Sequence, residues 1–127
     1  MIPKVSIIIL TYNGKAHLLE CLKSLENISY RNKEIIVYDN GSGDNTAEII
    51  KKRFKRVHVV YRKENIGYCK GTNDAYRHAR GKYILFLNND TTVSKNFLTP
   101  LVRRMEKDPA NGIVQPKLIF QKTKKLQ

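Results

Sequence analysis

The chain has 127 residues, is 41% hydrophobic, and carries a net charge of +13 from 24 lysines and arginines against 11 acids. This length suits one domain with a single core, and the hydrophobic content excludes a disordered chain. No apolar run approaches the ~20 residues of a membrane-spanning helix, and no signal-peptide pattern is present. We therefore expect a cytoplasmic protein. Its charge favours polyanionic partners: nucleotide diphosphates, an anionic membrane face or nucleic acid.

Apolar runs alternate with polar breaks along the chain and predict four strands that alternate with helices. Asn45, or Asp44 before it, is expected to cap the second helix, and Glu48 has capping-box spacing from Asn45. Gly81 is expected to end the third helix. The predicted strands are 5–10, 34–38, 57–61 and 83–87, and the first and third helices are about 15–25 and 68–79.

The end of the chain is less regular. Pro100 allows either a helix that begins at 99–100 after a short turn or a kinked helix that begins near Ser94. Residues 113–115 and 117–120 are expected to be extended, and 121–127 to form a basic, flexible tail. The basic run at 51–56 is typical of a solvated helix face.

Four strand–helix alternations predict an α/β fold with a mostly parallel, Rossmann-like sheet flanked by helices. All strands of a parallel sheet end at the same edge, and ligands of open α/β sheets bind outside those carboxyl ends. The polar residues that follow the strands should therefore converge on one site. They occupy positions 11–13, 39–40, 62–67 and 88–90.

The segment 83–92 carries the most specific pattern. Five apolar residues predict a strand buried on both faces, and Asn88, Asn89 and Asp90 follow it directly. A carboxylate placed there without a Gly-rich loop suits a hydrated divalent cation that neutralises a phosphate. The same residue types also suit a polar turn or a helix N-cap, which is the alternative interpretation.

Other catalytic and binding motifs do not fit. Gly41-Ser42-Gly43 begins like a dinucleotide fingerprint, but Thr46 occupies the position of the third glycine. Gly14-Lys15-Ala16 lacks the upstream glycine and the hydroxyl residue of a P-loop. The three histidines fall within predicted helices or a strand, which favours structural roles over a catalytic triad.

Four ordered segments share a pattern with a known family: 5–13 (VSIIILTYN), 36–44 (IVYDNGSGD), Asn65 to Asn73 with Gly67 and Gly71, and 81–90 (GKYILFLNND). Together they resemble the family-2 glycosyltransferases, enzymes of the GT-A fold that use nucleotide-sugar donors. The resemblance covers nearly the whole chain up to about residue 120. Each segment is weak alone, but the ordered set is specific.

The resemblance implies roles for the matching residues. Thr11, Tyr12 and Asn13 would line the nucleoside pocket, and Asp39 would accept a hydrogen bond from a ring N–H of the base. Three further residues would border the ribose and diphosphate, where glycines permit close backbone approach. These residues are Asn65, Gly67 and Gly71.

Residues 88–90 match the family's D-x-D signature, whose last carboxylate binds Mg²⁺ or Mn²⁺ bridging the diphosphate. Asp90 fills that place, with Asn89 beside it in the donor site. The first Asp of the signature is Asn88 here, which offers an oxygen but no charge. We therefore expect weaker or more water-mediated metal binding, which Mg²⁺ tolerates.

The chain lacks a candidate for the family's catalytic base, an Asp or Glu well beyond D-x-D that deprotonates the acceptor hydroxyl. After Asp90 the acids are Glu106 and Asp108, which we interpret as solvated surface charges. We therefore expect residues 1–127 to be one GT-A-like donor domain without the acceptor half. The catalytic residue is unknown.

The leading hypothesis is an inverting, metal-assisted glycosyltransferase donor domain for a UDP, dTDP or GDP sugar. A nucleotide-sugar-binding module without activity of its own is the second, and a basic nucleic-acid-binding protein is the third. The charge also suggests a peripheral position at the inner membrane face, near a lipid-linked acceptor.

Overall fold

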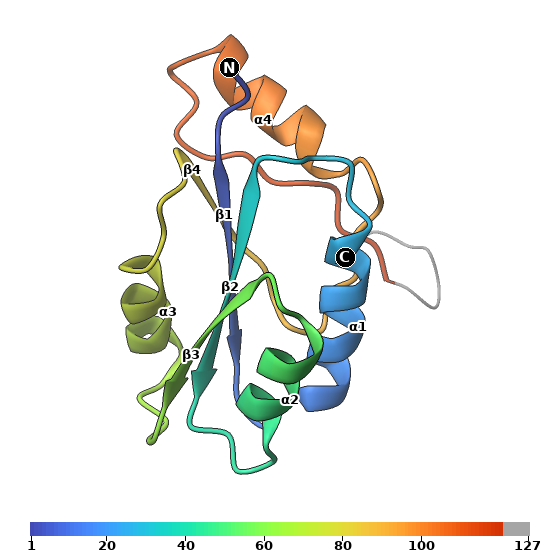
Figure 1. The fold of residues 1–127 in the computed structure, drawn as a ribbon. Coiled ribbons are helices and arrows are strands. Elements are labelled where there is room, and N and C mark those ends of the chain that lie inside the picture. The colour runs from blue at the N-terminus through green and yellow to red at the C-terminus, as the bar shows by residue number, and fades with distance from the viewer. Residues whose placement is uncertain (121–127) are drawn as a thin grey trace.

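The computed structural model describes residues 1–120, in which four strands form one parallel sheet between helices (Figure 1). The strand order is β3-β2-β1-β4, and each neighbouring pair is parallel. This confirms the predicted α/β fold, whereas the predicted tail 121–127 lies outside the described residues. The elements are β1 (Val5–Thr11), α1 (Lys15–Glu26), β2 (Lys33–Asn40), α2 (Thr46–Arg53), β3 (Val57–Arg62), α3 (Tyr68–Tyr76), β4 (Tyr83–Phe86) and α4 (Leu98–Lys107).

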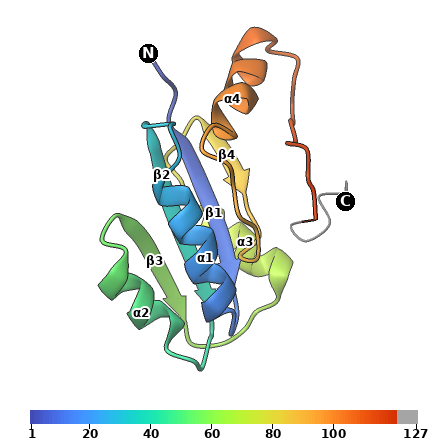
Figure 2. The same ribbon diagram turned by 90° about the vertical axis from the view of Figure 1, so that its right-hand side faces the viewer.

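The sheet has a hydrophobic cluster on each face because alternate residues of a strand point to opposite sides. Ile7 and Ile9 of β1 pack into the larger cluster with side chains of α1, α2 and α4. Ile8 packs into the smaller cluster with Ala75 of α3. Figures 1 and 2 show α1 and α2 on one side of the sheet and α3 on the other. Among residues 1–120, no helix has the length and apolar content needed to cross a bilayer.

The prediction that strand 83–87 is buried on both faces was wrong. Within the described residues β4 is an edge strand that pairs only with β1, with Ile8 opposite Phe86. Phe86 is therefore 52% exposed despite lying in an apolar run. The strand ends at Phe86, although the N–H of Leu87 still donates to the carbonyl of Ile8 at 2.9 Å.

The last helix, α4, follows the first of the two alternatives for Pro100. A turn closed by the Phe97 N–H and the Ser94 carbonyl precedes the helix, which begins at Leu98. Pro100 thus lies in the first turn, where a helix needs no backbone donor. The segment that follows, 109–120, contains no helix and no continuous strand.

Two local predictions differ from the structure. The capping box at α2 does not form: Asn45 has φ 59° and no side-chain cap bond, while a carboxylate oxygen of Asp44 accepts from the Thr46 N–H at 3.2 Å. The helix α3 ends at Tyr76, so Gly81 does not cap it. A Cβ at Gly81 would lie 2.6 Å from the Ser6 nitrogen, so the glycine permits close approach to β1 instead.

The carboxylate of Glu34 ties the amino ends of β1 and β2 to the segment that leads into β4. It accepts hydrogen bonds from the Ser6 hydroxyl, the Lys4 ammonium and, at 2.7 Å, the Arg80 N–H. Burial alone would raise the pKa of Glu34, but these donors hold it below the usual range. A carboxyl whose pKa is depressed by folding stabilises the fold above its unfolded pKa and loses that contribution as pH falls through the folded pKa.

We predict that Glu34→Gln lowers the free energy of unfolding by about 1–2 kcal/mol near neutral pH, because three charge-assisted contacts weaken. The measurement is urea denaturation at neutral pH and again in acid, where the difference from wild type should shrink. Glu48→Gln, an exposed charge change on α2, is the matched control. An equal loss in both variants, or a difference that does not depend on pH, would contradict this role for Glu34.

Candidate functional site

The end of β2 and the loops that follow β1, β3 and β4 meet at the carboxyl edge of the sheet and line an open cavity of about 370 Å³. This volume lies within the usual range for small-molecule sites. Seven of the residues predicted from the sequence line it: Thr11, Tyr12, Asn65, Gly67, Asn88, Asn89 and Asp90. Asn40 also lines the cavity, as the convergence of the strand ends predicted, and so do Leu10 and Tyr68, which were not predicted.

The cavity wall nearest β3 depends on Asn40, which is 2% exposed. Its amide nitrogen donates to the side-chain oxygen of Asn65 at 2.9 Å and to the carbonyl of Gly67 at 3.2 Å, and its oxygen accepts from the Ile66 N–H at 3.1 Å. One buried side chain therefore fixes the whole loop between β3 and α3. The strand-end position beside Asp39 was the signal available in the sequence, but it could not reveal these three bonds.

Asp39 lies behind the cavity and is fully buried. One carboxylate oxygen accepts from the Ser42 N–H at 2.9 Å, and the other has no hydrogen-bond partner among the described residues. Leaving a buried acceptor unpaired is costly, about 1–3 kcal/mol. The second oxygen therefore has no donor within the described part of the chain.

Asn13, predicted to line the nucleoside pocket, instead joins the loops after β1 and β2. Its N–H donates to the Ser42 hydroxyl at 2.8 Å, and its side-chain oxygen accepts from the Gly43 N–H at 2.9 Å. It has φ 50°, a left-handed conformation that asparagine tolerates better than most residues. The pair of loops is therefore held as a unit beside Asp39.

Gly71, predicted to border the diphosphate, does not line the cavity either. It is buried in α3, and a Cβ there would lie 2.9 Å from a methyl carbon of Leu10 and 3.3 Å from the amide nitrogen of Asn40. The glycine lets α3 pack closely on the ends of β1 and β2. Gly67, which does line the cavity, has φ 82° and begins α3 in a conformation that side chains disfavour.

The loop after β4 is anchored at its middle residue. The amide nitrogen of Asn89 donates to the Thr11 hydroxyl at 3.0 Å. Gly14 makes room for this contact, because a Cβ there would lie 2.4 Å from the same nitrogen. Asp90 is exposed, and its negative charge adds to burial in raising the pKa of Cys21 to about 12.

The residues that line the cavity suit a divalent cation only in combination with a phosphate ligand. Among those described, Asp90 is the one carboxylate, accompanied by the amides of Asn88 and Asn89. No group of three or more His, Cys, Asp or Glu side chains able to hold a metal occurs within residues 1–120. Mg²⁺ commonly binds one or two carboxylates and completes its shell with water and substrate phosphates. The donor set fits that arrangement.

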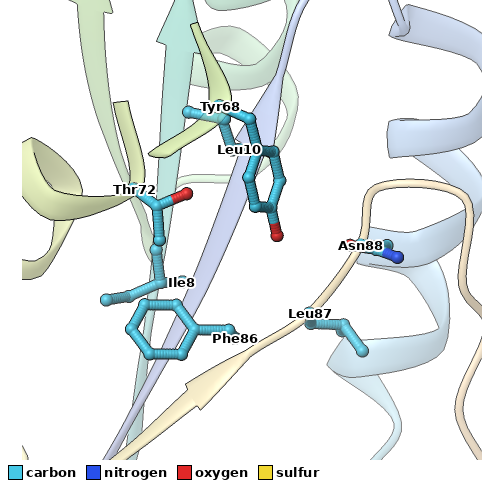
Figure 3. Close-up of a pocket in the computed structure, with 7 residues that line it drawn as sticks. All are labelled: Ile8, Leu10, Tyr68, Thr72, Phe86, Leu87 and Asn88. Atoms are coloured by element: carbon cyan, nitrogen blue, oxygen red, sulfur yellow. The ribbon is translucent and has the colours of Figure 1, made fainter. Parts of the chain in front are cut away.

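A smaller cavity of about 10 Å³, enough for about one water molecule, adjoins the main one (Figure 3). Tyr68 and Asn88 line both cavities, and Phe86 forms part of the floor of the smaller one. The Thr72 hydroxyl is buried there and has no partner among the described residues. Tyr68, which is 61% exposed, therefore borders both cavities.

Glu106 lies at the opposite edge of the sheet from the cavity. It accepts from the Lys82 ammonium at 2.6 Å and from the Tyr83 hydroxyl, at the amino end of β4. The Lys82 ammonium is the main cause that holds the pKa of Glu106 below its usual range. Glu106 is exposed, as predicted, but it also forms an ion pair with Lys82. Asp108 accepts from the Ala110 N–H at 3.0 Å.

We predict that Asn40→Ala lowers the free energy of unfolding by about 2–3 kcal/mol, because three bonded groups lose their buried partner. Amide hydrogen exchange should rise most in residues 65–67, which the side chain holds. Asn96→Ala, at an exposed position, is the control. Unchanged exchange in 65–67 would show that the loop does not depend on Asn40.

Both the sequence and the fold are similar to those of known proteins. Residues 6–126 match the model of Glycosyl transferase family 2. A curated relative, the putative teichuronic acid biosynthesis glycosyltransferase TuaG of Bacillus subtilis, is 34% identical over 99 residues, which are 76% of this chain and 39% of TuaG. The chain spans less than half the length of the curated relatives it matches.

Two solved structures share the fold. S. aureus TarS 1-349 in complex with UDP-GlcNAc has a TM-score of 0.76 and 26% identity, over 93% of this chain and 38% of that one. The mannosyltransferase PcManGT from Pyrobaculum calidifontis, in complex with GDP-Man and Mn²⁺, has a TM-score of 0.77 and 24% identity, over 90% of this chain and 34% of that one. Because the family model matches almost the whole length of this chain, the chain belongs to glycosyl transferase family 2.

Proposed function

We propose that the chain binds a nucleotide-diphospho-sugar in the cavity at the carboxyl edge and forms the donor half of a glycosyltransferase. The observation that carries this proposal is that the end of β2 and the loops after the other three strands line one cavity, which Asp90 borders. A single cavity can hold both ends of a nucleotide diphosphate. TarS, a relative in fold and sequence, was solved with UDP-GlcNAc, which makes a uridine nucleotide the first donor to test. Nucleotides of dTDP and GDP type are the alternatives.

At one end of the donor, the base would reach the free oxygen of Asp39. That oxygen is buried and unpaired among the described residues, and a ring N–H of uracil, thymine or guanine would satisfy it. Tyr12 is 52% exposed at the mouth of the cavity, where its ring can pack against the base. Because Asp39 does not line the cavity in this structure, the proposal requires a local movement of the surrounding loops on binding.

At the other end, Asp90 would hold Mg²⁺ or Mn²⁺ against the diphosphate. When bound, the cation would neutralise charge on the departing nucleoside diphosphate. Asn88 would contribute an amide oxygen or a hydrogen bond to the sugar, without charge. The bond between Asn89 and Thr11 would keep this loop in place while the diphosphate binds.

The catalytic base and the acceptor site are proposed to come from a polypeptide segment outside this chain. Glu106 is bound to Lys82 at the far edge of the sheet, so it is not placed to act on an acceptor. The exposed Phe86 on edge strand β4 supports this edge as the contact surface of such a segment. Without it, the chain would be a nucleotide-sugar-binding module, which is the second candidate function.

For the complete enzyme we propose inverting sugar transfer to a lipid-linked acceptor in cell-envelope polysaccharide synthesis, on the cytoplasmic side of the membrane. The charge of +13 supports an anionic membrane as a partner. The relatives named for teichuronic acid and for poly-β-1,6-N-acetyl-D-glucosamine synthesis support a polysaccharide product. Multiple turnover of a labelled nucleotide-sugar distinguishes an active enzyme from a binding module.

We predict that UDP with Mn²⁺ raises the melting temperature by several degrees, because a ligand at ~100 times its Kd stabilises by about 2.7 kcal/mol. Asp90→Asn should abolish the part of the shift that requires Mn²⁺. Glu20→Gln, which removes one exposed negative charge from α1, should keep it. A Mn²⁺-dependent shift that survives in Asp90→Asn would rule out Asp90 as the ligand.

We predict that Asp39→Asn weakens UDP binding by about 10–100-fold, because an amide N–H₂ replaces the free acceptor that faces the base. CDP provides a matched comparison, since its N3 accepts a hydrogen bond where that of UDP donates one. Calorimetric titration should show a preference for UDP in the wild type that is lost or reversed in the variant. If the same preference persists, Asp39 does not read the base.

A further inference from the structure

The edge of the sheet opposite the cavity carries a cluster of positive charge. Arg31 and Lys33 lie at the start of β2, and Lys55 and Arg56 directly precede β3. Because β2 and β3 are parallel neighbours, these four residues lie on the same edge. We call them the amino-edge basic face. Three more cations, Lys51, Lys52 and Arg53, occupy the last turn of α2, which leads into this edge.

The positive charges of this face are not balanced within the described part of the chain. None of the four residues forms a salt bridge with another described residue, whereas the neighbouring Lys4 and Lys82 are paired with Glu34 and Glu106. Burial and then the charges of Arg31 and Arg56 lower the pKa of Lys33. The fold thus holds like charges within range of one another, at a cost that an external polyanion would relieve.

The helix dipole does not explain the face. Cations in the last turn of α2 are favoured by the partial negative charge of a helix carboxyl end. That effect accounts for Lys51, Lys52 and Arg53 but not for Arg31 and Lys33, which lie in a loop and a strand.

An exposed apolar side chain adjoins the basic face. Ile2 is 61% exposed, and its carbonyl accepts from the Asn32 amide at 2.7 Å. The Tyr30 hydroxyl donates to the carbonyl of Pro3 in the same segment. These bonds hold Ile2 beside Arg31. An apolar group next to several cations suits the headgroup region of a bilayer, which rewards both features.

We propose that the amino-edge basic face binds the surface of an anionic phospholipid bilayer and turns the candidate donor site away from it. The exposed rings of Tyr12, Tyr61 and Tyr68, which could stack on nucleobases, lie at the opposite edge, so nucleic acid fits this face less well. Binding to the bilayer follows from the charge distribution and is independent of the proposed nucleotide binding.

The orientation limits which acceptors can reach the site. The seven steps of β2 from Lys33 to Asn40 separate the basic face from the cavity by about 23 Å at ~3.3 Å per residue. A sugar acceptor anchored in the same bilayer would therefore have to extend that far from the headgroups. The end of a growing lipid-linked polymer meets this requirement, whereas a single sugar on a lipid phosphate does not.

The test compares vesicles of phosphatidylcholine alone with vesicles in which about a third of the lipid is phosphatidylglycerol. The full chain should sediment with the anionic vesicles only, and ~1 M salt should release it. Arg31→Gln/Arg56→Gln should lower the partition coefficient about 30-fold, as expected for about 1 kcal/mol per charge. Lys63→Gln/Lys70→Gln removes the same amount of charge from the opposite edge and should change the partition coefficient less than threefold.

Equal losses in the two double variants, or no preference for anionic vesicles, would overturn the proposal. The wild type could also bind DNA but not vesicles. If Arg31→Gln/Arg56→Gln then abolished the DNA binding, the face would be assigned to nucleic acid instead. The UDP-dependent melting shift should be the same in Arg31→Gln/Arg56→Gln as in the wild type, so failure of membrane binding and failure of nucleotide binding are separately visible.

A fluorophore on Cys69, exposed beside the cavity, reports the orientation. Quenchers in the lipid headgroups should leave it bright on bound vesicles. In a Cys69→Ser background, the same quenchers should quench the label on Asn27→Cys, because residue 27 lies at the amino edge. The reverse pattern would show that the donor site faces the bilayer.

Discussion

The parallel direction of all four strands is the constraint on which the rest of the structure depends. Parallel strands must end at one edge, so residues as far apart in sequence as Thr11 and Asn89, 78 positions, come into hydrogen-bond contact. The same geometry gathers the strand starts at the other edge. The molecule therefore has two chemically different ends, one with polar cavity-forming loops and one with unbalanced positive charge.

Polar side chains at and after the strand ends, and not the hydrophobic core, hold the loops of the candidate site. Asn40 fixes the loop after β3, Asn13 joins the loops after β1 and β2, and Asn89 anchors the loop after β4. Asn40 uses both its amide nitrogen and its oxygen, Asn13 uses its side-chain oxygen and Asn89 uses its amide nitrogen. Each of these loops is therefore held by at least one side-chain hydrogen bond. Asp39 is the exception, because one of its oxygens lacks a partner among the described residues. This unpaired acceptor is the reason for which the proposed function assigns the base of the nucleotide to Asp39.

The sequence was sufficient for the strands and their parallel arrangement, because apolar runs that alternate with helices are local patterns, and the family resemblance supplied most of the cavity lining. It did not reveal that β4 is an edge strand, since an apolar run looks the same whether or not a further strand covers it. Nor could it separate residues that line the cavity from those that position the loops. Asn13 and Gly71 belong to the second group because of a left-handed turn and a close helix contact, and neither is visible in residue spacing.

Central to the proposed function is one cavity that holds a nucleotide diphosphate together with a divalent cation. The most direct measurement is an amide NMR spectrum recorded with UDP and substoichiometric Mn²⁺, whose paramagnetism broadens nearby signals. We expect broadening centred on residues 88–90 and extending to 11–14 and 65–68, and only when UDP is present. Broadening centred on the amino edge around residues 31–34, or the same pattern without nucleotide, would contradict it.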